Sequence, residues 1–181
     1  MNKPVWEPIF DKYYSDNGPL RELLTVHSRK VADKALAIVD AHPELGADRR
    51  FVEEAAMLHD IGIFLTDADG IHCHGTAKYI CHGYLGAELL EKEGLHRHAL
   101  VAERHTGTGL TLAQIESQEL PVPHRDMIPV SIEEQIICFA DKFFSKTRPE
   151  VEKSIEGAEK SLMKFGQEGV IKFRRWCSDF L

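Results

Sequence analysis

The stretch that decides the fold is MLHDIG, residues 57–62. Met57 and Leu58 belong to a segment whose apolar residues recur with a helical period. An imidazole and a carboxylate, His59 and Asp60, follow them at once. Burying two such groups without partners would cost several kcal/mol. The stretch therefore predicts that His59 and Asp60 bind something inside the protein.

The composition is that of one globular domain. The chain has 181 residues, of which 43% are hydrophobic and 28% are charged. It has no apolar run near the ~18 residues of a spanning helix, and its N-terminal region lacks the apolar segment of a signal peptide. The four cysteines are scattered, which indicates reduced thiols, so we expect a cytoplasmic protein.

The charge bears on the partners of the protein. A net charge of −7 argues against nucleic acid or an anionic membrane as a partner. It allows a small anionic, phosphorylated substrate that is held by a few local cations. The sequence leaves the oligomeric state open.

Apolar periodicity predicts an all-α protein. Apolar side chains and His27 recur at three- and four-residue steps between residues 18 and 46. Similar patterns predict further helices over residues 49–60, 82–94, 96–105, 112–120, 132–147, 149–166 and 170–180. Residues 61–80 have no clear period and are expected to form a long loop. With no strand alternation in the chain, we expect a single bundle of roughly seven or eight helices.

Polar residues interrupt the apolar faces of these helices. His27 shares a face with Leu24 and Val31, and Asp141 lies within the apolar run IICFADKFF. Taken alone, His27 would be a core histidine bonded to a backbone carbonyl group, but a shared cation explains all the interruptions together. The set consists of four imidazoles and two carboxylates: His27, His59, Asp60, His82, His105 and Asp141.

This mixture of nitrogen and oxygen ligands predicts a site for two divalent metal ions. Six ligands exceed the need of one tetrahedral site, and Fe or Mn is favoured, with Zn, Co, Ni or Mg as alternatives. The adjacent His59 and Asp60 cannot share one helix face. At a helix end they can reach neighbouring metals, or Asp60 can bridge them. Gly62 then lets the chain turn away close to the site.

The order of these residues resembles the HD-domain superfamily of metal-dependent phosphohydrolases. His27, the pair of His59 and Asp60, and Asp141 stand in the order of its motif. HDIG, residues 59–62, matches the HDIG subgroup. The segments HGYLGAELL and ERHTGTGL are similar to the further histidine motifs of the dinuclear members.

The resemblance covers roughly residues 20–148 and implies an all-α fold of the HD-domain type. We expect one domain over residues 1–181, in which the helices of residues 150–180 pack on the motif core. Several phosphodiesterase members carry a lysine shortly after the HD pair, where this chain has HDIGIF, and the GYP signature is missing. Cyclic di-GMP is therefore not the expected substrate.

The resemblance also implies a role for each ligand. His82 and His105 would complete the second metal, and the other four residues would be the core ligands. Asp60 would bridge the ions and orient a hydroxide that attacks phosphorus, which is two-metal activation of water. The resemblance thus implies a phosphohydrolase that cleaves a phosphate ester or anhydride of a nucleotide-like small molecule.

Two other functions are compatible with the same ligands. Some HD-fold proteins use this ligand set as a mixed-valent di-iron centre for oxygen-dependent C–C or C–P cleavage. A non-catalytic domain would bind metal or nucleotide without turnover. The identity of the ligands does not separate these alternatives from a hydrolase.

Further polar residues are candidates for substrate binding, because they neighbour the motifs or lie in long loops. A guanidinium, ammonium or hydroxyl group there would suit phosphate oxygens. The alternative for each is a solvated surface group, and His72 and His74 lack the grouped ligands of a structural zinc site. The candidates are Arg104, Thr106, Lys142, His72, His74 and His124.

Overall fold

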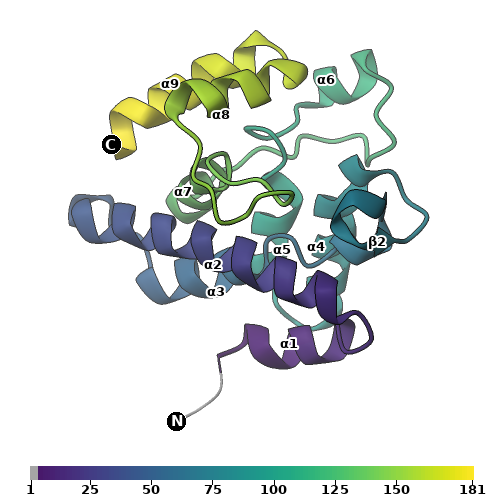
Figure 1. The fold of residues 1–181 in the computed structure, drawn as a ribbon. Helices are drawn as coiled ribbons and strands as arrows, with labels where there is room; N and C mark the ends of the chain where they lie inside the picture. Colours follow the sequence, from purple (N-terminus) through teal and green to yellow (C-terminus); the bar gives the residue numbers. More distant parts are fainter. Residues whose placement is uncertain (1–3) are drawn as a thin grey trace.

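In the computed structural model, residues 4–181 are described, and helices make up most of this part of the chain (Figure 1). This part of the chain contains nine α-helices, so the predicted all-α fold is confirmed. They are α1 (Trp6–Tyr13), α2 (Gly18–Ala41), α3 (Arg49–Leu58), α4 (His82–Lys92), α5 (His96–Arg104), α6 (Leu112–Ser117), α7 (Ile132–Asp141), α8 (Ile155–Leu162) and α9 (Gln167–Phe180). Short 3-10 helices also occur: η1 (Pro43–Leu45), η2 (Ile63–Leu65), η3 (Asp69–Ile71), η4 (Tyr79–Cys81) and η5 (Met163–Phe165).

Within residues 4–181, no helix is both long enough and apolar enough to cross a membrane.

The segment of residues 61–80, expected to be a loop, contains a small hairpin. β1 (Asp67–Ala68) pairs antiparallel with β2 (Cys73–His74), and Asp67 lies opposite His74. Strands of two residues are too short to show an alternation of polar and apolar side chains. The sequence pattern therefore contained no sign of them.

Several helix boundaries also differ from the prediction. The helix expected over residues 132–147 ends at Asp141, and the N–H groups of the next residues donate to carbonyl groups three residues earlier, as in turns. The helix expected over residues 149–166 begins only at Ile155, so residues 142–154 are irregular. α1 was not predicted, because it begins without a side-chain cap and so carries no start signal.

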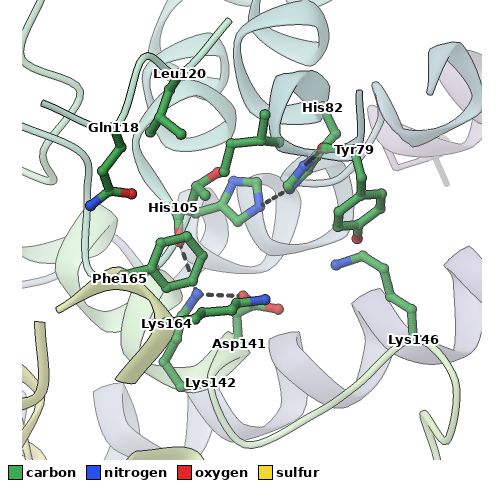
Figure 2. Close-up of a pocket in the computed structure, with 13 residues that line it drawn as sticks. Tyr79, His82, His105, Gln118, Leu120, Asp141, Lys142, Lys146, Lys164 and Phe165 are labelled. Atoms are coloured by element: carbon green, nitrogen blue, oxygen red, sulfur yellow. Dashed lines mark hydrogen bonds and ion pairs between the residues drawn. The ribbon is translucent and has the colours of Figure 1, made fainter. Parts of the chain in front are cut away.

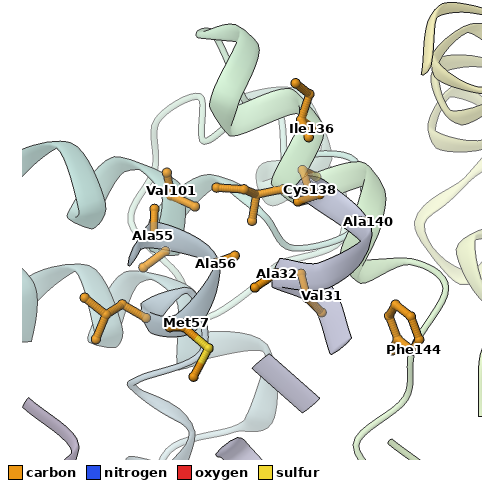
Figure 3. Close-up of a cluster of buried hydrophobic side chains, with 14 of the residues drawn as sticks. Val31, Ala32, Ala55, Ala56, Met57, Val101, Ile136, Cys138, Ala140 and Phe144 are labelled. Atoms are coloured by element: carbon orange, nitrogen blue, oxygen red, sulfur yellow. The ribbon is translucent and has the colours of Figure 1, made fainter. Parts of the chain in front are cut away.

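The hydrophobic core lies between α2, α3, α5 and α7 (Figure 3). α2 packs along α3 and α7, and α5 packs on α3, α4 and α7. Small buried side chains stand on these faces, among them Ala32 of α2, Ala55 and Ala56 of α3, and Ala140 of α7. Because small side chains let helix backbones approach closely, groups at neighbouring helix ends come within reach of one another.

The two C-terminal helices lie together beside α7, at the top of Figure 1. Phe173, Trp176 and Phe180 of α9 surround Phe139 of α7, with ring centroids 5.2, 6.4 and 5.4 Å away. Aromatic pairs of this kind contribute about 0.5–1.5 kcal/mol each beyond the burial of their surface. The packing holds η5, which joins α8 to α9, in a defined position.

Gly62 lies where the chain that follows Asp60 passes the start of α4. A Cβ atom at Gly62 would lie 2.4 Å from the backbone nitrogen of Gly86 and 2.4 Å from the carbonyl oxygen of His82. Its φ of −85° is open to any residue, so the requirement for glycine is steric. The close approach keeps His82 beside Asp60.

Replacing Gly62 by alanine should destabilise the fold, because backbone atoms of α4 would have to move. We expect Gly62→Ala to lower the free energy of unfolding by about 1–3 kcal/mol, the usual effect of overpacking. Gly70→Ala is the matched control, since a Cβ atom there would meet nothing within 4 Å. Urea denaturation of the metal-free proteins measures both effects, and equal stability of the two variants would contradict the close approach.

Candidate metal centre

The structure brings the six predicted ligands to one buried place. One lies in the middle of a helix and five lie at helix ends. They are His27 within α2, His59 and Asp60 after α3, His82 at the start of α4, His105 after α5, and Asp141 at the end of α7. All six are between 0% and 8% exposed. The ends of four helices meet beside the middle of α2, so potential ligands from five helices lie close together.

Backbone carbonyl groups set the orientation of three of the imidazoles. In each case Nδ1 faces the carbonyl oxygen of the residue three positions earlier. The pairs are His59 with Ala56 at 2.6 Å, His82 with Tyr79 at 2.6 Å, and His105 with Ala102 at 2.8 Å. A carbonyl oxygen only accepts, so Nδ1 is the protonated nitrogen that donates. Nε2 of each ring is thereby left as the potential ligand atom, as in metal-bound histidines.

Asp60 lies at the middle of the cluster, and its two oxygens face different histidines. Oδ2 is 3.0 Å from Nε2 of His59 and 3.1 Å from Nε2 of His27. Oδ1 is 3.3 Å from Nε2 of His105 and 3.4 Å from Nε2 of His82. One carboxylate is therefore shared between two groups of nitrogen atoms, which is the arrangement of a bridging ligand.

Two groups of potential ligands result, and the atoms within each lie no more than 4.8 Å apart. The first group is His27, His59, Asp60 and Asp141, and the second is Asp60, His82 and His105. Nitrogen and carboxylate oxygen together suit Fe, Mn, Zn and similar divalent ions. The cluster thus has the composition of a site for two cations.

Buried polar atoms without hydrogen-bond partners show whether the cluster suits metal ions. Nε2 of His59 and both carboxylate oxygens of Asp60 are buried and make no hydrogen bond. Nε2 of His82 lies 3.0 Å from Nε2 of His105, although both rings donate through Nδ1. Each unsatisfied buried polar atom costs about 1–3 kcal/mol. Cations between these atoms would satisfy all of them, so the residues fit the metal ions that the sequence predicted.

The pKa values of the cluster show that its carboxylates favour positive charge nearby. Burial opposes the charged form of His59, but Asp60 and Asp141 outweigh it and raise its pKa to about 9. Burial lowers the pKa of His82 to about 3. The pKa of Asp60 lies well below its usual value despite complete burial, because His59 and Lys146 supply positive charge. A proton on His59 and the Lys146 ammonium therefore compensate the carboxylates.

A pocket of about 430 Å³ opens onto this cluster (Figure 2). Three of the predicted ligands form part of its wall, which a substrate could therefore reach. The lining residues are Tyr79, Ile80, His82, His105, Thr106, Gly107, Gln118, Leu120, Asp141, Lys142, Lys146, Lys164 and Phe165.

Two of the residues predicted to bind substrate, Thr106 and Lys142, line the pocket. The Lys142 ammonium donates to Oδ2 of Asp141 at 2.7 Å and to the carbonyl oxygen of His105 at 2.9 Å. These bonds fix the orientation of Asp141. An ammonium has three donors, so one remains for a ligand in the pocket.

The other four residues predicted to bind substrate do not line this pocket. Arg104 binds both carboxylate oxygens of Glu134, at 3.2 and 2.9 Å, and so joins α5 to α7. His72 is exposed, with φ of 62°, and His74 is exposed and bonds to the Asp69 carboxylate at 2.9 Å. His124 is also exposed.

Several pocket residues were missed in the sequence. Lys146 lies five positions after Asp141, but the expected helix over residues 132–147 concealed that the chain turns back toward the cluster. Lys164 and Phe165 belong to η5, beyond the motif region. Figure 2 shows Phe165 and Tyr79 on opposite sides of the pocket. Lys164 and Phe165 carry no motif, so the packing of the C-terminal helices is what places them at the pocket.

Comparison with known proteins identifies the family. The model of the family described as HD domain matches residues 25–145, which is most of the chain and includes all six clustered residues. The chain therefore belongs to the HD-domain family, a superfamily of metal-dependent phosphohydrolases. The prediction made from HDIG and the ordered histidines is confirmed.

Curated relatives are similar over the same part of the chain. An uncharacterized protein of Methanocaldococcus jannaschii is 39% identical over 132 residues, which are 72% of this chain and 69% of that protein. A tRNA (cytidine(56)-2'-O)-methyltransferase of Picrophilus torridus is 36% identical over 128 residues, 70% of this chain but 33% of the relative. A protein of the same name in Thermoplasma volcanium is 28% identical over 159 residues, 87% of this chain and 42% of the relative. No solved structure matches the chain.

Removing one histidine of the second group should remove one metal ion. Because His82 belongs only to the group that contains His105, His82→Ala should bind one ion where the wild type binds two, and should stay folded. His74→Ala is the control, since this exposed residue belongs to neither group and should leave both ions bound. Elemental analysis of protein loaded without air gives the count, and one ion or none in the wild type would contradict the dinuclear centre.

Metal affinity should rise with pH up to about 9. A ligand histidine must be neutral, and without a cation His59 keeps its proton up to a pKa of about 9. Its proton must therefore leave when metal binds at pH 7–9, whereas His82, with its pKa near 3, is already neutral. Linkage to one proton predicts a gain of about tenfold in affinity per pH unit over this range. Chelator competition with Mn²⁺ measures it, and an unchanged affinity between pH 7 and pH 9 would contradict the assignment of His59.

Proposed function

We propose that this HD-domain chain is a phosphohydrolase that uses two divalent metal ions to cleave a phosphate ester or anhydride of a small, nucleotide-like molecule. The observation that carries the proposal is the carboxylate of Asp60. Its oxygens are divided between two histidine groups, and the cluster opens into a pocket lined by three lysines. Ligands for activating metal ions would thus lie next to ammonium groups that could bind phosphate.

The residues that would hold the ions are those of the two groups. His27, His59 and Asp141 serve one ion, His82 and His105 serve the other, and Asp60 serves both. Iron or manganese is our proposal for the metal, since both accept mixed imidazole and carboxylate ligands. When bound, two such ions activate water for attack on phosphorus and stabilise the charge of the phosphoryl oxygens.

The lysines supply the positive charge that an anionic substrate needs. Lys142, Lys146 and Lys164 all line the pocket, although the chain as a whole carries a net charge of −7. Local cations in an acidic protein favour a small anion over a long polyanion. Lys142 would orient Asp141 and donate its remaining N–H to a phosphate oxygen.

The remaining walls of the pocket favour a substrate that has an apolar or aromatic part. Phe165 and Tyr79 face the pocket from opposite sides, and Ile80 and Leu120 add apolar surface (Figure 2). A nucleobase would stack on such rings. The volume of about 430 Å³ is within the usual range of pockets for small ligands.

The two relatives named as tRNA methyltransferases are much longer than this chain, which spans 33% and 42% of them. Methyl transfer to tRNA is the activity in the names of those longer proteins. The acidic surface also disfavours tRNA as a partner. Because oxygen-dependent cleavage and binding without turnover use the same ligands, the test of function must separate all three.

Hydrolysis should occur without oxygen. We expect Mn- or Fe-loaded protein to release phosphate or a nucleotide from a panel of phosphomonoesters, nucleotides and dinucleotide polyphosphates, equally in air and without it. Asp60→Ala should abolish turnover, because both groups of ligands lose their shared member. Lys142→Ala should reduce kcat/KM by about ten- to a hundredfold, as expected when one charged hydrogen bond of about 1.5–3 kcal/mol is removed.

His124→Ala is the matched control, because this exposed residue does not line the pocket and should keep full activity. Product that forms only in air, with matching uptake of oxygen, would overturn hydrolysis in favour of an oxygenase. Ligand binding with no product under either condition would instead make the chain a binding domain.

A further inference from the structure

Lys146 makes an unusual contact with the central carboxylate of the site. Its Nζ lies 2.6 Å from Oδ2 of Asp60, the oxygen that also faces His27 and His59. The side chain of Lys146 is 13% exposed and that of Asp60 is fully buried. Oδ2 nevertheless receives no hydrogen bond of good geometry. The contact is therefore mainly an attraction between buried charges, which does not require a fixed direction.

The ammonium and a metal ion would compete for the same oxygen. Oδ2 of Asp60 faces His27 and His59, which belong with Asp60 to the first group of potential metal ligands. Two cations that share one buried carboxylate oxygen repel each other strongly, because little water screens them. A cation that binds there must therefore displace the ammonium of Lys146 or bind less tightly in its presence.

We propose that Lys146 is a built-in counter-cation of the metal-free protein: it neutralises Asp60 until metal binds, and then turns into the pocket to meet the anionic substrate. This inference rests on the metal-binding part of the proposed function and not on turnover. It gives Lys146 a different role from Lys142, although both lysines pair with a carboxylate of the cluster.

The surroundings of the two lysines explain the difference. Lys142 is held by two acceptors, Oδ2 of Asp141 and the carbonyl oxygen of His105. Lys146 has Asp60 as its ion-pair partner, and its ammonium lies 5.8 Å from the centre of the Tyr79 ring. It belongs to the irregular segment after α7. Tyr79 and Asp141 also interact with its ammonium and line the same pocket, so the side chain can leave Asp60 and stay near them.

Space is present for this movement. Lys146 lines the pocket of Figure 2 and also a neighbouring cavity of about 450 Å³, whose wall includes Gly70, Ser145 and Lys164. Once turned away from Asp60, the ammonium would stand at the junction of these spaces, beside the metal centre. Metal binding would thereby add a positive charge to the pocket, and metal and phosphate would bind cooperatively.

The test is the variant Lys146→Met, which keeps an aliphatic side chain and removes the charge. In the metal-free protein, it should lower the melting temperature, because Asp60 loses its counter-cation. It should also tighten the binding of Mn²⁺ by about tenfold, because the competing ammonium is gone. The metal-loaded variant should therefore melt close to the metal-loaded wild type. The two effects are linked. If the variant destabilises the metal-free fold and leaves the metal-bound fold unchanged, the free energy of metal binding becomes more favourable by the same amount.

Lys153→Met is the matched control. This lysine is half-buried in the same irregular segment, but its ammonium donates to the carbonyl oxygen of Lys142 at 3.4 Å. Asp141 attracts it without the direct contact that Lys146 makes with Asp60. Lys153→Met should therefore change the affinity for Mn²⁺ much less than Lys146→Met does. Lys146→Gln, which is neutral but polar, serves as a second variant and should shift the affinity in the same direction as Lys146→Met.

Two results would overturn the proposal. One is an affinity for Mn²⁺ that is unchanged or weaker in both Lys146 variants. The other is an equal loss of melting temperature with and without metal, which would make Lys146 a purely structural residue. A Lys146→Met protein that folds only with metal supports the proposal. Because the readouts are metal affinity and melting temperature, a wild type that binds metal without cleaving phosphate esters refutes the proposed function alone.

Discussion

The structure depends on one buried carboxylate, that of Asp60, which cannot stay charged in the core without compensating positive charge and polar partners. His27 and His59 face one oxygen, His82 and His105 face the other, and Lys146 lies against the first. An isolated carboxylate in such a place would be strongly unfavourable. Five helices place nitrogen-bearing side chains around Asp60 and so offset that cost. The same side chains make the cluster suited to cations.

The architecture serves this requirement by bringing helix ends together. Small residues on α2, α3 and α7 let the helices approach closely, and glycine at position 62 lets the chain pass against α4. Carbonyl groups of the last helical turns orient three imidazoles, so that Nδ1 is occupied and Nε2 faces inward. The ligands are thus positioned by rigid helices, which is the condition for a preorganised site.

The pocket is formed by a longer part of the chain than the candidate metal ligands are. Its floor consists of ligand residues from the HD-domain region, whereas Lys164 and Phe165 come from η5, after the residues that match the family. The aromatic contacts of α9 with Phe139 hold that segment in place.

The sequence by itself determined the helical class and the family, and it singled out the six histidines and aspartates that the fold brings together. Helical periodicity is local, and histidines or aspartates on apolar faces are conspicuous because burying them needs compensation. Only the tertiary structure decided which residues stand at the pocket. Arg104 neighbours His105 in sequence but points to Glu134, while Lys146 returns to Asp60 because α7 ends at Asp141. Where a side chain points after a helix ends depends on long-range packing, and no local pattern in the sequence records that.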